Sequence, residues 1–167
     1  MSQTLKIHEV SFQRIQVKDS LKLSAMLVAA PAAYSRFFIP FAFDAENVKS
    51  VLRKAKKDIF FAVKVNGDWA GFYMLRGFDS GYRVPAYGVW ITPKYKNCGL
   101  AALTLAHAFA ICKLNGVGQM MLKVHPKNVK ALKLYEKTGF IRTGSDPRNS
   151  NFVYQKSFQK KKGRSES

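Results

Sequence analysis

The sequence is poor in cysteine, with two in 167 residues, Cys98 and Cys112. Two cysteines with no partner at metal-ligand spacing build neither a disulfide framework nor a metal site, so we expect two free thiols and no bound metal. The sequence also lacks any run of 18 or more apolar residues, which argues against a membrane-spanning helix. Its longest nearly apolar stretch, residues 100–112, contains Thr104 and His107 and is typical of a buried helix.

Acidic residues are scarce as well. Ten Asp and Glu stand against 28 Lys and Arg, which gives a formal net charge of +18. This excess is far larger than solubility requires, and it indicates an anionic partner. A nucleic acid, a membrane surface and a phosphorylated small molecule would each satisfy the charge, and a basic surface without a specific partner also remains open.

The composition of the first and last residues indicates the cellular compartment and the extent of the domain. Residues 1–20 carry charges throughout and have no continuous apolar region of the kind that a secretory signal needs, so we expect a cytoplasmic protein. The basic run from Lys160 to Arg164 follows the last apolar residues and is typical of a disordered tail. We therefore expect one domain over residues 1–158 and a basic tail over residues 159–167.

Periodicity and turn signals predict the order of the elements. Strands are expected over residues 5–17, 59–65, 69–75, 85–91, 120–124 and 151–158, and helices over residues 19–30, 44–56, 100–112 and 127–138. Asp19 and Asp44 are expected to cap the first two helices, and Asn66-Gly67 is a strong hairpin signal. The order predicts an α/β protein with a mixed sheet and helices on both faces.

The segment from Trp90 to Ala101 combines a strand, a basic loop and a helix start. The strand stops at Pro93, a loop with lysines follows, and the apolar helix begins after Gly99. The free N–H groups and the partial positive charge at a helix start both stabilise an anion. The pattern therefore indicates a pyrophosphate-binding junction, although a glycine between a strand and a helix also serves ordinary turns.

Two signatures together carry a family resemblance that covers about residues 5–158. The first is Lys96-Asn97-Cys98-Gly99-Leu100-Ala101, and the second is made by Asn128, Ala131, Tyr135 and Gly139-Phe140. They resemble the two motifs of the GCN5-related N-acetyltransferase (GNAT) superfamily, with a lysine where the first motif has Arg or Gln. The resemblance implies a single-domain acetyltransferase fold with a mixed, mostly antiparallel sheet of about six to seven strands and helices on both faces.

The resemblance also implies acetyl-coenzyme A as the acetyl donor. Its pyrophosphate is expected on the loop amides and its pantetheine arm beside the strand end. The implied cofactor-binding residues are Trp90, Ile91, Lys96, Asn97, Cys98, Gly99, Leu100, Ala101 and Asn128. Lys96 keeps a charge but lacks the planar fork of Arg, so we expect it to act on phosphate as a point charge. Asn128 is also expected to cap the last helix.

The catalytic residues follow from the same resemblance. Tyr135 is similar to the family's general acid, which protonates the departing thiolate, and a phenol near pKa 10 can deliver a proton to a thiolate near 8.5. Tyr135 also lies on the apolar face of its helix, where a tyrosine is often simply part of the core. Many relatives carry a carboxylate base in the preceding strand, whereas this chain has Ala86-Tyr87-Gly88-Val89.

Four candidates remain for the general base: His125, Asp79, Tyr87 and a water relay. His125 is favoured because an imidazole titrates near pH 6.5, although a histidine before a proline is often only a surface residue. At pH 7 a lysine amine of pKa about 10.4 is neutral in roughly one molecule in 2,500, whereas an amine near 7.8 is neutral in about one in seven. A weak base thus favours an α-amine or an amino-sugar amine as the acceptor.

Because the net charge is so strongly positive, we also expect the acceptor to be a small anionic molecule, such as a nucleotide-linked amino sugar. Residues 31–43 contain five aromatic rings and two prolines, and these rings either fill the core or form a cleft wall. The resemblance assigns acceptor pockets to this segment and to the loop 78–84. The expected substrate-binding residues are Tyr34, Phe37, Phe38, Asp79 and Tyr87.

Two other functions remain open: acetylation of a ribosomal or RNA-associated target, and a non-catalytic acetyltransferase-like module that binds nucleic acid. Lysines recur at helical spacing at Lys127, Lys130, Lys133 and Lys137. They can track phosphates, but a solvated helix face is the commoner meaning, and this helix lacks aromatic residues that stack on bases. A monomer and a homodimer are equally compatible with the sequence.

Overall fold

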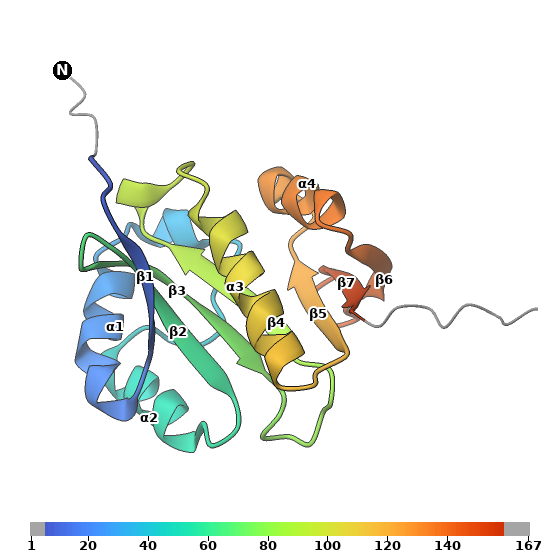
Figure 1. Cartoon of the computed structure of the whole chain (residues 1–167), viewed down its shortest axis with the longest axis horizontal. Coiled ribbons are helices and arrows are strands. Elements are labelled where there is room, and N and C mark those ends of the chain that lie inside the picture. Colours follow the sequence, from blue (N-terminus) through green and yellow to red (C-terminus); the bar gives the residue numbers. More distant parts are fainter. Residues whose placement is uncertain (1–5, 159–167) are drawn as a thin grey trace, which may run out of the picture.

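The computed structural model describes residues 6–158 and contains a seven-stranded sheet in the order β1-β2-β3-β4-β5-β7-β6. The strands are β1 (Val10–Arg14), β2 (Ile59–Val65), β3 (Asp68–Arg76), β4 (Ala86–Ile91), β5 (Gln119–Val124), β6 (Ile141–Ser145) and β7 (Phe152–Ser157). The helices are α1 (Ser20–Val28), α2 (Ala45–Lys54), α3 (Leu100–Leu114) and α4 (Val129–Lys137). The predicted fold class is confirmed (Figure 1).

The sheet consists of two antiparallel parts joined by one parallel contact. Strands β1 to β4 form an antiparallel meander, and β7 lies between β5 and β6 and is antiparallel to both. Asn66 and Gly67 connect β2 to β3 with positive φ angles of 50° and 85°, as the predicted two-residue hairpin requires. The single parallel pairing is between β4 and β5.

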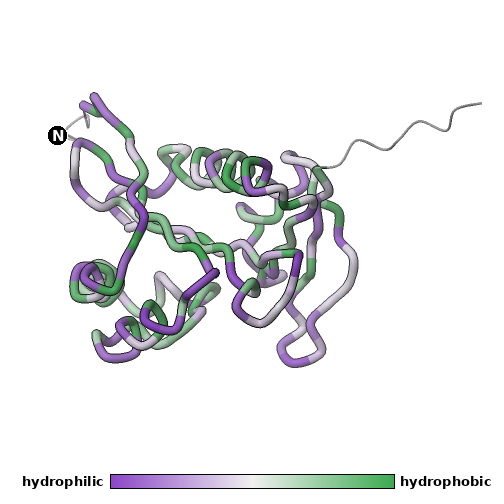
Figure 2. The backbone as a smooth tube through the Cα atoms, turned by 60° about the horizontal axis from the view of Figure 1, so that its bottom comes forward, coloured by the Kyte–Doolittle hydropathy of each residue, from purple (hydrophilic) through white to green (hydrophobic). Residues whose placement is uncertain are grey.

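Each face of the sheet has its own hydrophobic core. On one face, α1 and α2 pack on alternate residues of β2, β3 and β4, among them Phe60, Phe72 and Trp90. On the other face, α3 and α4 pack on the intervening residues, among them Tyr73 and Leu122. In Figure 2 helices lie on both sides of the sheet, and hydrophobic segments follow the strands between them. The alternation explains why β3 is buried along most of its length.

Several predicted boundaries change in the structure. The first strand is shorter than residues 5–17, because the chain enters a 3-10 turn at Val17–Asp19 before α1. Asp19 precedes α1 but does not cap it; its carboxylate accepts a hydrogen bond from the Gln16 amide at 2.8 Å. Strand β6 escaped prediction from the residues because all five of its side chains are exposed and show no alternation.

The structure also bears on the cysteines, on membrane-spanning helices and on metal clusters, and one further expectation lies outside the described residues. Cys98 and Cys112 are both free thiols. Within residues 6–158 no helix is long and apolar enough to cross a membrane, and no cluster of three or more His, Cys, Asp or Glu side chains could hold a metal ion. The basic run from Lys160 to Arg164 falls outside the described part of the chain.

Candidate active site

The candidate site lies where β4 and β5 separate. The two strands share one paired position, Ala86 with Met121, and then diverge toward the start of α3 and the start of α4 (Figure 1). A cavity of about 400 Å³ opens between them. Its walls come from β4, the β4–α3 loop, α3, the end of β5, α4 and the segment before α2. The site is therefore built from most elements of the second half of the chain and one segment of the first.

The outer edge of β4 presents unpaired backbone to this cavity. The Thr92 amide donates to the Ala70 carbonyl at 2.8 Å, and in an antiparallel ladder every second residue faces the partner strand. The backbone N–H and C=O groups of Trp90 therefore point toward β3. Those of Val89 and Ile91 point the other way, toward the gap between β4 and β5. The Tyr34 hydroxyl donates to the Ile91 carbonyl at 2.6 Å. The backbone groups of Val89 and the Ile91 amide have no strand partner among the described residues.

The N-terminus of α3 faces the same cavity without a side-chain cap. Gly99 precedes the helix with a φ of 82°, a left-handed conformation that glycine adopts at little cost. The first helical bond runs from the Leu103 amide to the Gly99 carbonyl, so the amides of the three preceding residues have no helical acceptor. Leu100, Ala101 and Ala102 carry these amides, and all three line the cavity. The start of α3 thus has the free donors and positive dipole end that an anion requires.

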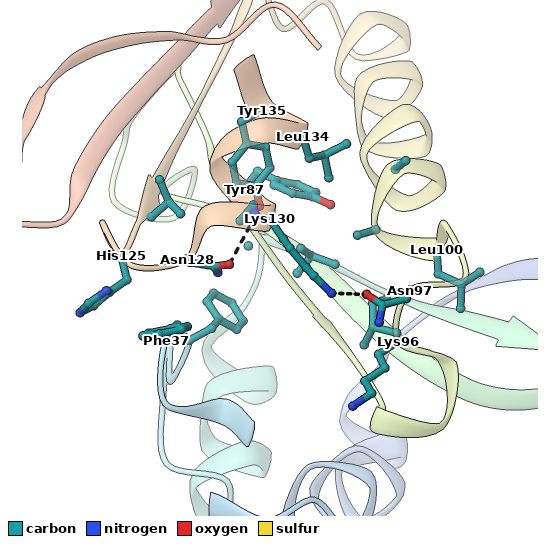
Figure 3. A pocket seen from close by; sticks show the side chains of 18 of the residues that line it. Phe37, Tyr87, Lys96, Asn97, Leu100, His125, Asn128, Lys130, Leu134 and Tyr135 are labelled. Carbon is teal, nitrogen blue, oxygen red and sulfur yellow. Dashed lines mark hydrogen bonds between the residues drawn. The ribbon is translucent and has the colours of Figure 1, made fainter. Parts of the chain in front are cut away.

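Two buried tyrosines meet on the α3 and α4 side of the cavity. The rings of Tyr87 and Tyr135 lie edge to face with centroids 6.4 Å apart (Figure 3). The Tyr87 hydroxyl shares a hydrogen bond of 3.1 Å with the Thr104 hydroxyl, whereas no partner for the Tyr135 hydroxyl occurs among residues 6–158. Burial raises the pKa of both phenols, and for Tyr87 the nearby Tyr135 adds to the effect. Both therefore remain protonated at neutral pH, which disfavours Tyr87 as a base.

A lysine from α4 reaches across the cavity to the β4–α3 loop. The Lys130 ammonium donates to the Asn97 side-chain oxygen at 2.7 Å, and Figure 3 shows this bond running from one wall of the cavity to the other. Asn97 has a φ of 59°, which is uncommon for a residue other than glycine. Lys96 also lines the cavity, but its side chain extends away from the Asn97–Lys130 pair in Figure 3.

Aromatic residues from the segment before α2 close the other side of the cavity. Phe37 stacks on His125 with ring centroids 4.7 Å apart, and Phe38 packs against Gly88. A Cβ at position 88 would lie 2.7 Å from the Phe38 ring and 2.8 Å from the Met74 methyl, so these side chains fill the space of any longer residue. At position 88, Phe38 and Met74 therefore leave no room for a carboxylate side chain.

His125 lies at the end of β5 and is held on two sides. Besides the stacking on Phe37, its Nδ1 accepts a hydrogen bond from the Lys127 amide at 3.1 Å. In the neutral ring this leaves the proton on Nε2. His125 can therefore take up a proton at Nδ1 only by releasing the Lys127 amide.

The described residues that line the cavity include no Asp or Glu, but they do include Lys96, Lys123 and Lys130. Lys123 is paired at 2.8 Å with Asp146, whose side chain is 3% exposed and also accepts from Arg148. Hydrogen bonds from Arg148 and then from Lys123 hold the pKa of the Asp146 carboxyl well below its usual range. Asp146 thus compensates the charge of Lys123, and the positive charge of the lining comes from Lys96 and Lys130, which have no carboxylate partner among the described residues.

Some predicted site residues lie elsewhere. Asp79 does not line the cavity; its carboxylate accepts from the amides of Lys56, Lys57 and Asp58 at 2.9–3.1 Å. The loop 78–84 joins the end of β3 to the start of β4, whereas the cavity lies at the other end of β4. Its residues line a separate groove with residues 116–119, so the expectation that this loop forms the acceptor pocket finds no support in the geometry.

Two predicted cofactor-binding residues, Trp90 and Cys98, also lie outside the lining of the cavity. The Trp90 side chain is buried on the α1 and α2 face, where its Nε1 donates to the Ser35 hydroxyl at 3.0 Å. Cys98 is exposed, and its thiol points to the Lys96 carbonyl rather than into the cavity. By contrast, the structure brings together in the cavity wall Tyr34, Phe37, Phe38, Tyr87, Ile91, Lys96, Asn97, Gly99, Leu100, Ala101, His125, Asn128 and Tyr135.

Comparison with known proteins gives a family match and one curated relative. A model of the acetyltransferase (GNAT) family matches residues 27–140. Streptothricin acetyltransferase from Streptomyces lavendulae is 28% identical over 87 residues, which are 52% of this chain and 46% of that protein. The aligned part thus spans about half the length of the curated relative.

Solved structures share the fold at lower identity. PaiA N-acetyltransferase from Thermoplasma acidophilum, in complex with coenzyme A, is 17% identical with a TM-score of 0.72 over 90% of this chain and 100% of that chain. Ribosomal-protein-S5-alanine acetyltransferase from Vibrio fischeri is 14% identical with a TM-score of 0.73 over 92% of this chain and 95% of that chain. Similarity at this level concerns the fold.

Proposed function

The chain belongs to the acetyltransferase (GNAT) family, and from that premise we propose that it transfers the acetyl group of acetyl-coenzyme A to the primary amine of a small anionic acceptor. The observation that carries the proposal is the start of α3, where free amides face a cavity lined by lysines. When bound, acetyl-coenzyme A supplies an acetyl group activated as a thioester.

The residues present suit the diphosphate and pantetheine parts of coenzyme A. Asp44 and Asn128 cap α2 and α4 with their side chains, whereas α3 begins without such a cap. The amides of the first turn of α3 are thus available to phosphate oxygens. The outward-facing backbone of Val89 and the Ile91 amide suit the peptide-like groups of the pantetheine arm, which can pair with a strand edge.

Tyr135 is the residue that we assign as the general acid. Its hydroxyl lines the cavity and has no partner among the described residues, and the raised pKa of this phenol keeps the proton on it at neutral pH. It can therefore donate a hydrogen bond to the sulfur that departs from the acetyl group. Full transfer of the proton would follow only where the negative charge on that sulfur makes it a strong enough acceptor, because the raised pKa of the phenol opposes the transfer.

For the base we retain His125, acting through Nδ1 after it releases the Lys127 amide. A water relay is the alternative. Either arrangement suits an amine that is already neutral in a substantial fraction of molecules, since neither is a strong fixed base. This supports an α-amine or an amino-sugar amine over a lysine side chain.

The charge of the lining supports an anionic acceptor. Lys96 and Lys130 would repel a polycationic amine, and no carboxylate among the described lining residues could hold one. An amine carried on a phosphorylated or carboxylated molecule would instead be attracted. The walls formed by Phe37 and Phe38 suit an apolar or flat part of the same acceptor.

A protein α-amine is the second candidate acceptor. Its ordinary pKa of about 7.7–8.0 makes a carboxylate base unnecessary, and the absence of a side chain at Gly88 accords with that. The Vibrio fischeri neighbour is a ribosomal-protein acetyltransferase, and the positive lining would favour a target bound to RNA.

Melting temperatures test the class of function. Acetyl-coenzyme A should raise the melting temperature of the protein because it binds the folded state alone, while single-stranded RNA at low salt should have a much smaller effect. Stabilisation by RNA without stabilisation by acetyl-coenzyme A would favour the nucleic-acid-binding module instead.

Labelled acetyl-coenzyme A then tests the acceptor. Matched pairs, such as glucosamine with glucosamine 6-phosphate, isolate the effect of negative charge, and spermidine and an N-terminal peptide serve as contrasting acceptors. We expect the phosphorylated member to have the higher kcat/KM. A preference for spermidine would contradict the proposal, and a preference for the peptide would favour the second candidate.

A further inference from the structure

Lys130 occupies a position that disfavours a lysine. It is the second residue of α4, and the first turn of that helix contains no acidic residue. The partial positive charge at a helix start destabilises a nearby cation by roughly 0.3–1 kcal/mol. A cation at this position therefore needs a compensating partner.

The partner that the structure provides is weak. The Lys130 ammonium donates to the neutral amide oxygen of Asn97, and both side chains are exposed to solvent. Among the described residues the salt bridges involve other side chains, so no carboxylate pairs with this ammonium. A hydrogen bond between exposed groups contributes little to stability. The contact with Asn97 alone does not account for a lysine here.

The direction in which the Lys130 side chain extends explains why a lysine is present at this position. Lys130 starts at the positive end of α4 and reaches the loop that precedes the positive end of α3 (Figure 3). Its ammonium thus adds a full charge at a cavity that the uncapped start of α3, with its free amides, and the positive end of α4 both face. Such a concentration of positive charge is stabilised by an anion between them.

We propose that Lys130 binds the diphosphate of coenzyme A, and that Asn97 holds its ammonium in place until the cofactor arrives. On binding, the ammonium exchanges the neutral Asn97 oxygen for a charged phosphate oxygen, which is the stronger acceptor. This inference rests on the proposed function. It assigns to α4 a phosphate contact that the sequence pattern had suggested for Lys96.

Calorimetric binding of coenzyme A and of pantetheine, which lacks the diphosphate, tests the proposal. Lys130→Gln can still donate to Asn97 but has lost the charge, whereas Lys130→Arg keeps the charge. Lys133→Gln removes a lysine from the same helix at a position outside the cavity wall, and it serves as the matched control.

We expect Lys130→Gln to weaken coenzyme A binding about tenfold, as the loss of one charge-assisted hydrogen bond predicts. Lys130→Arg should stay within about threefold of the wild type and Lys133→Gln within about twofold. Pantetheine should bind all four proteins equally, because it has no phosphate for Lys130 to contact.

Two results would overturn the inference while the proposed function stands. One is wild-type affinity for coenzyme A in Lys130→Gln, which would mean that the charge is irrelevant. The other is an equal loss of affinity for coenzyme A and pantetheine, which would mean that Lys130 only shapes the cavity. Failure of the wild-type protein to bind coenzyme A would instead remove the proposed function, and this inference with it.

Discussion

Tyr87 and Tyr135 differ in what their hydroxyls contact. Both are buried in the same wall, and burial raises the pKa of both. The Tyr87 hydroxyl is bonded to Thr104, whereas the Tyr135 hydroxyl has no partner among the described residues. A donor without a protein partner at the edge of a cavity is the one available to a ligand.

Replacement of Tyr135 by Phe should therefore reduce kcat about a hundredfold and leave the Kd for coenzyme A within about twofold, because it removes only the proton donor. Tyr87→Phe is the matched control: it should lower thermal stability through the lost Thr104 bond and reduce kcat much less. Steady-state kinetics and calorimetry measure both quantities. An unchanged kcat in Tyr135→Phe would remove this residue as the acid.

The packing of Phe38 against Gly88 shapes the part of the cavity wall that we assign to the acceptor. In Gly88→Ala the new methyl would come within 2.7 Å of the Phe38 ring and 2.8 Å of the Met74 methyl, so the Phe38 ring, which lines the cavity, must shift. We expect a severalfold rise in the KM for the acceptor and little change in coenzyme A affinity. Gly144→Ala, where nothing lies within 4 Å of the new methyl, is the control and should behave as the wild type. A higher KM in both variants would point to a general loss of stability.

The sequence predicted part of the site at this scale. The position of Asn128 predicted a helix cap, which is confirmed, and the family resemblance made Tyr135 a candidate acid, which stays a prediction. The sequence did not distinguish Lys130 from the three other lysines at helical spacing, because its contact with Asn97 exists only in the tertiary structure. A cation in the first turn of a helix was the available signal. Val89 was missed because strand register decides which residues face outward.

At the scale of elements, α3 differs from α2 and α4 in its uncapped start. The side-chain oxygens of Asp44 and Asn128 accept hydrogen bonds from the first-turn amides of α2 and α4, but the residue before α3 is Gly99. The stabilisation that a cap would give is thus absent in the free protein and is available from a bound anion.

A carboxylate introduced into the first turn of α3 should replace that anion. Ala102→Glu is expected to stabilise the free protein by about 0.5 kcal/mol, a rise in melting temperature of about 1–2 °C, and to weaken coenzyme A binding at least tenfold through repulsion. Ala106→Glu, also exposed and one turn further along the helix, should do neither. Equal behaviour of the two variants in melting and calorimetry would contradict the role assigned to the helix start.

Most elements could be predicted because their burial alternates with the period of a strand or a helix. Strand β6 had no such pattern, since it is exposed throughout and is held by its pairing with β7. The loop 78–84, which the family resemblance assigned to the acceptor pocket, lies at the end of β4 opposite the cavity, and a linear order of elements does not reveal which strand ends meet.

For the whole molecule, the titratable groups predict a loss of stability in acid in two steps. Burial lowers the pKa of His107, whose ring is stacked on Phe12 and bonded to Tyr73 at 2.6 Å. The unfolded chain therefore takes up this proton first, and the free energy of unfolding falls as the pH drops through about 6.5. The lowered pKa of Asp146 adds stability above about 3.9 that is lost on further acidification.

Urea unfolding midpoints between pH 8 and about pH 2 test this dependence. In His107→Gln the decline near pH 6.5 should shrink, although packing losses lower the midpoint at every pH. Asp146→Asn should lose stability already at neutral pH and show a weaker dependence below pH 4, because its pairing with Arg148 and Lys123 is gone. A decline near pH 6.5 of unchanged size in His107→Gln would assign it to another group.

The single paired position between β4 and β5 has a consequence for how the molecule opens. Within residues 6–158, strand pairing joins β5, β6 and β7 to the rest of the sheet only at Ala86 and Met121, beside the bond from the Met121 amide to the Pro85 carbonyl. This part can therefore detach from β4 with the loss of few backbone bonds. Its amides should exchange with solvent deuterium sooner than those of β2 and β3. A ligand that contacts both sides of the gap would hold the two parts of the sheet together. Coenzyme A should therefore slow deuterium uptake throughout β5 and α4, including residues that do not contact the ligand.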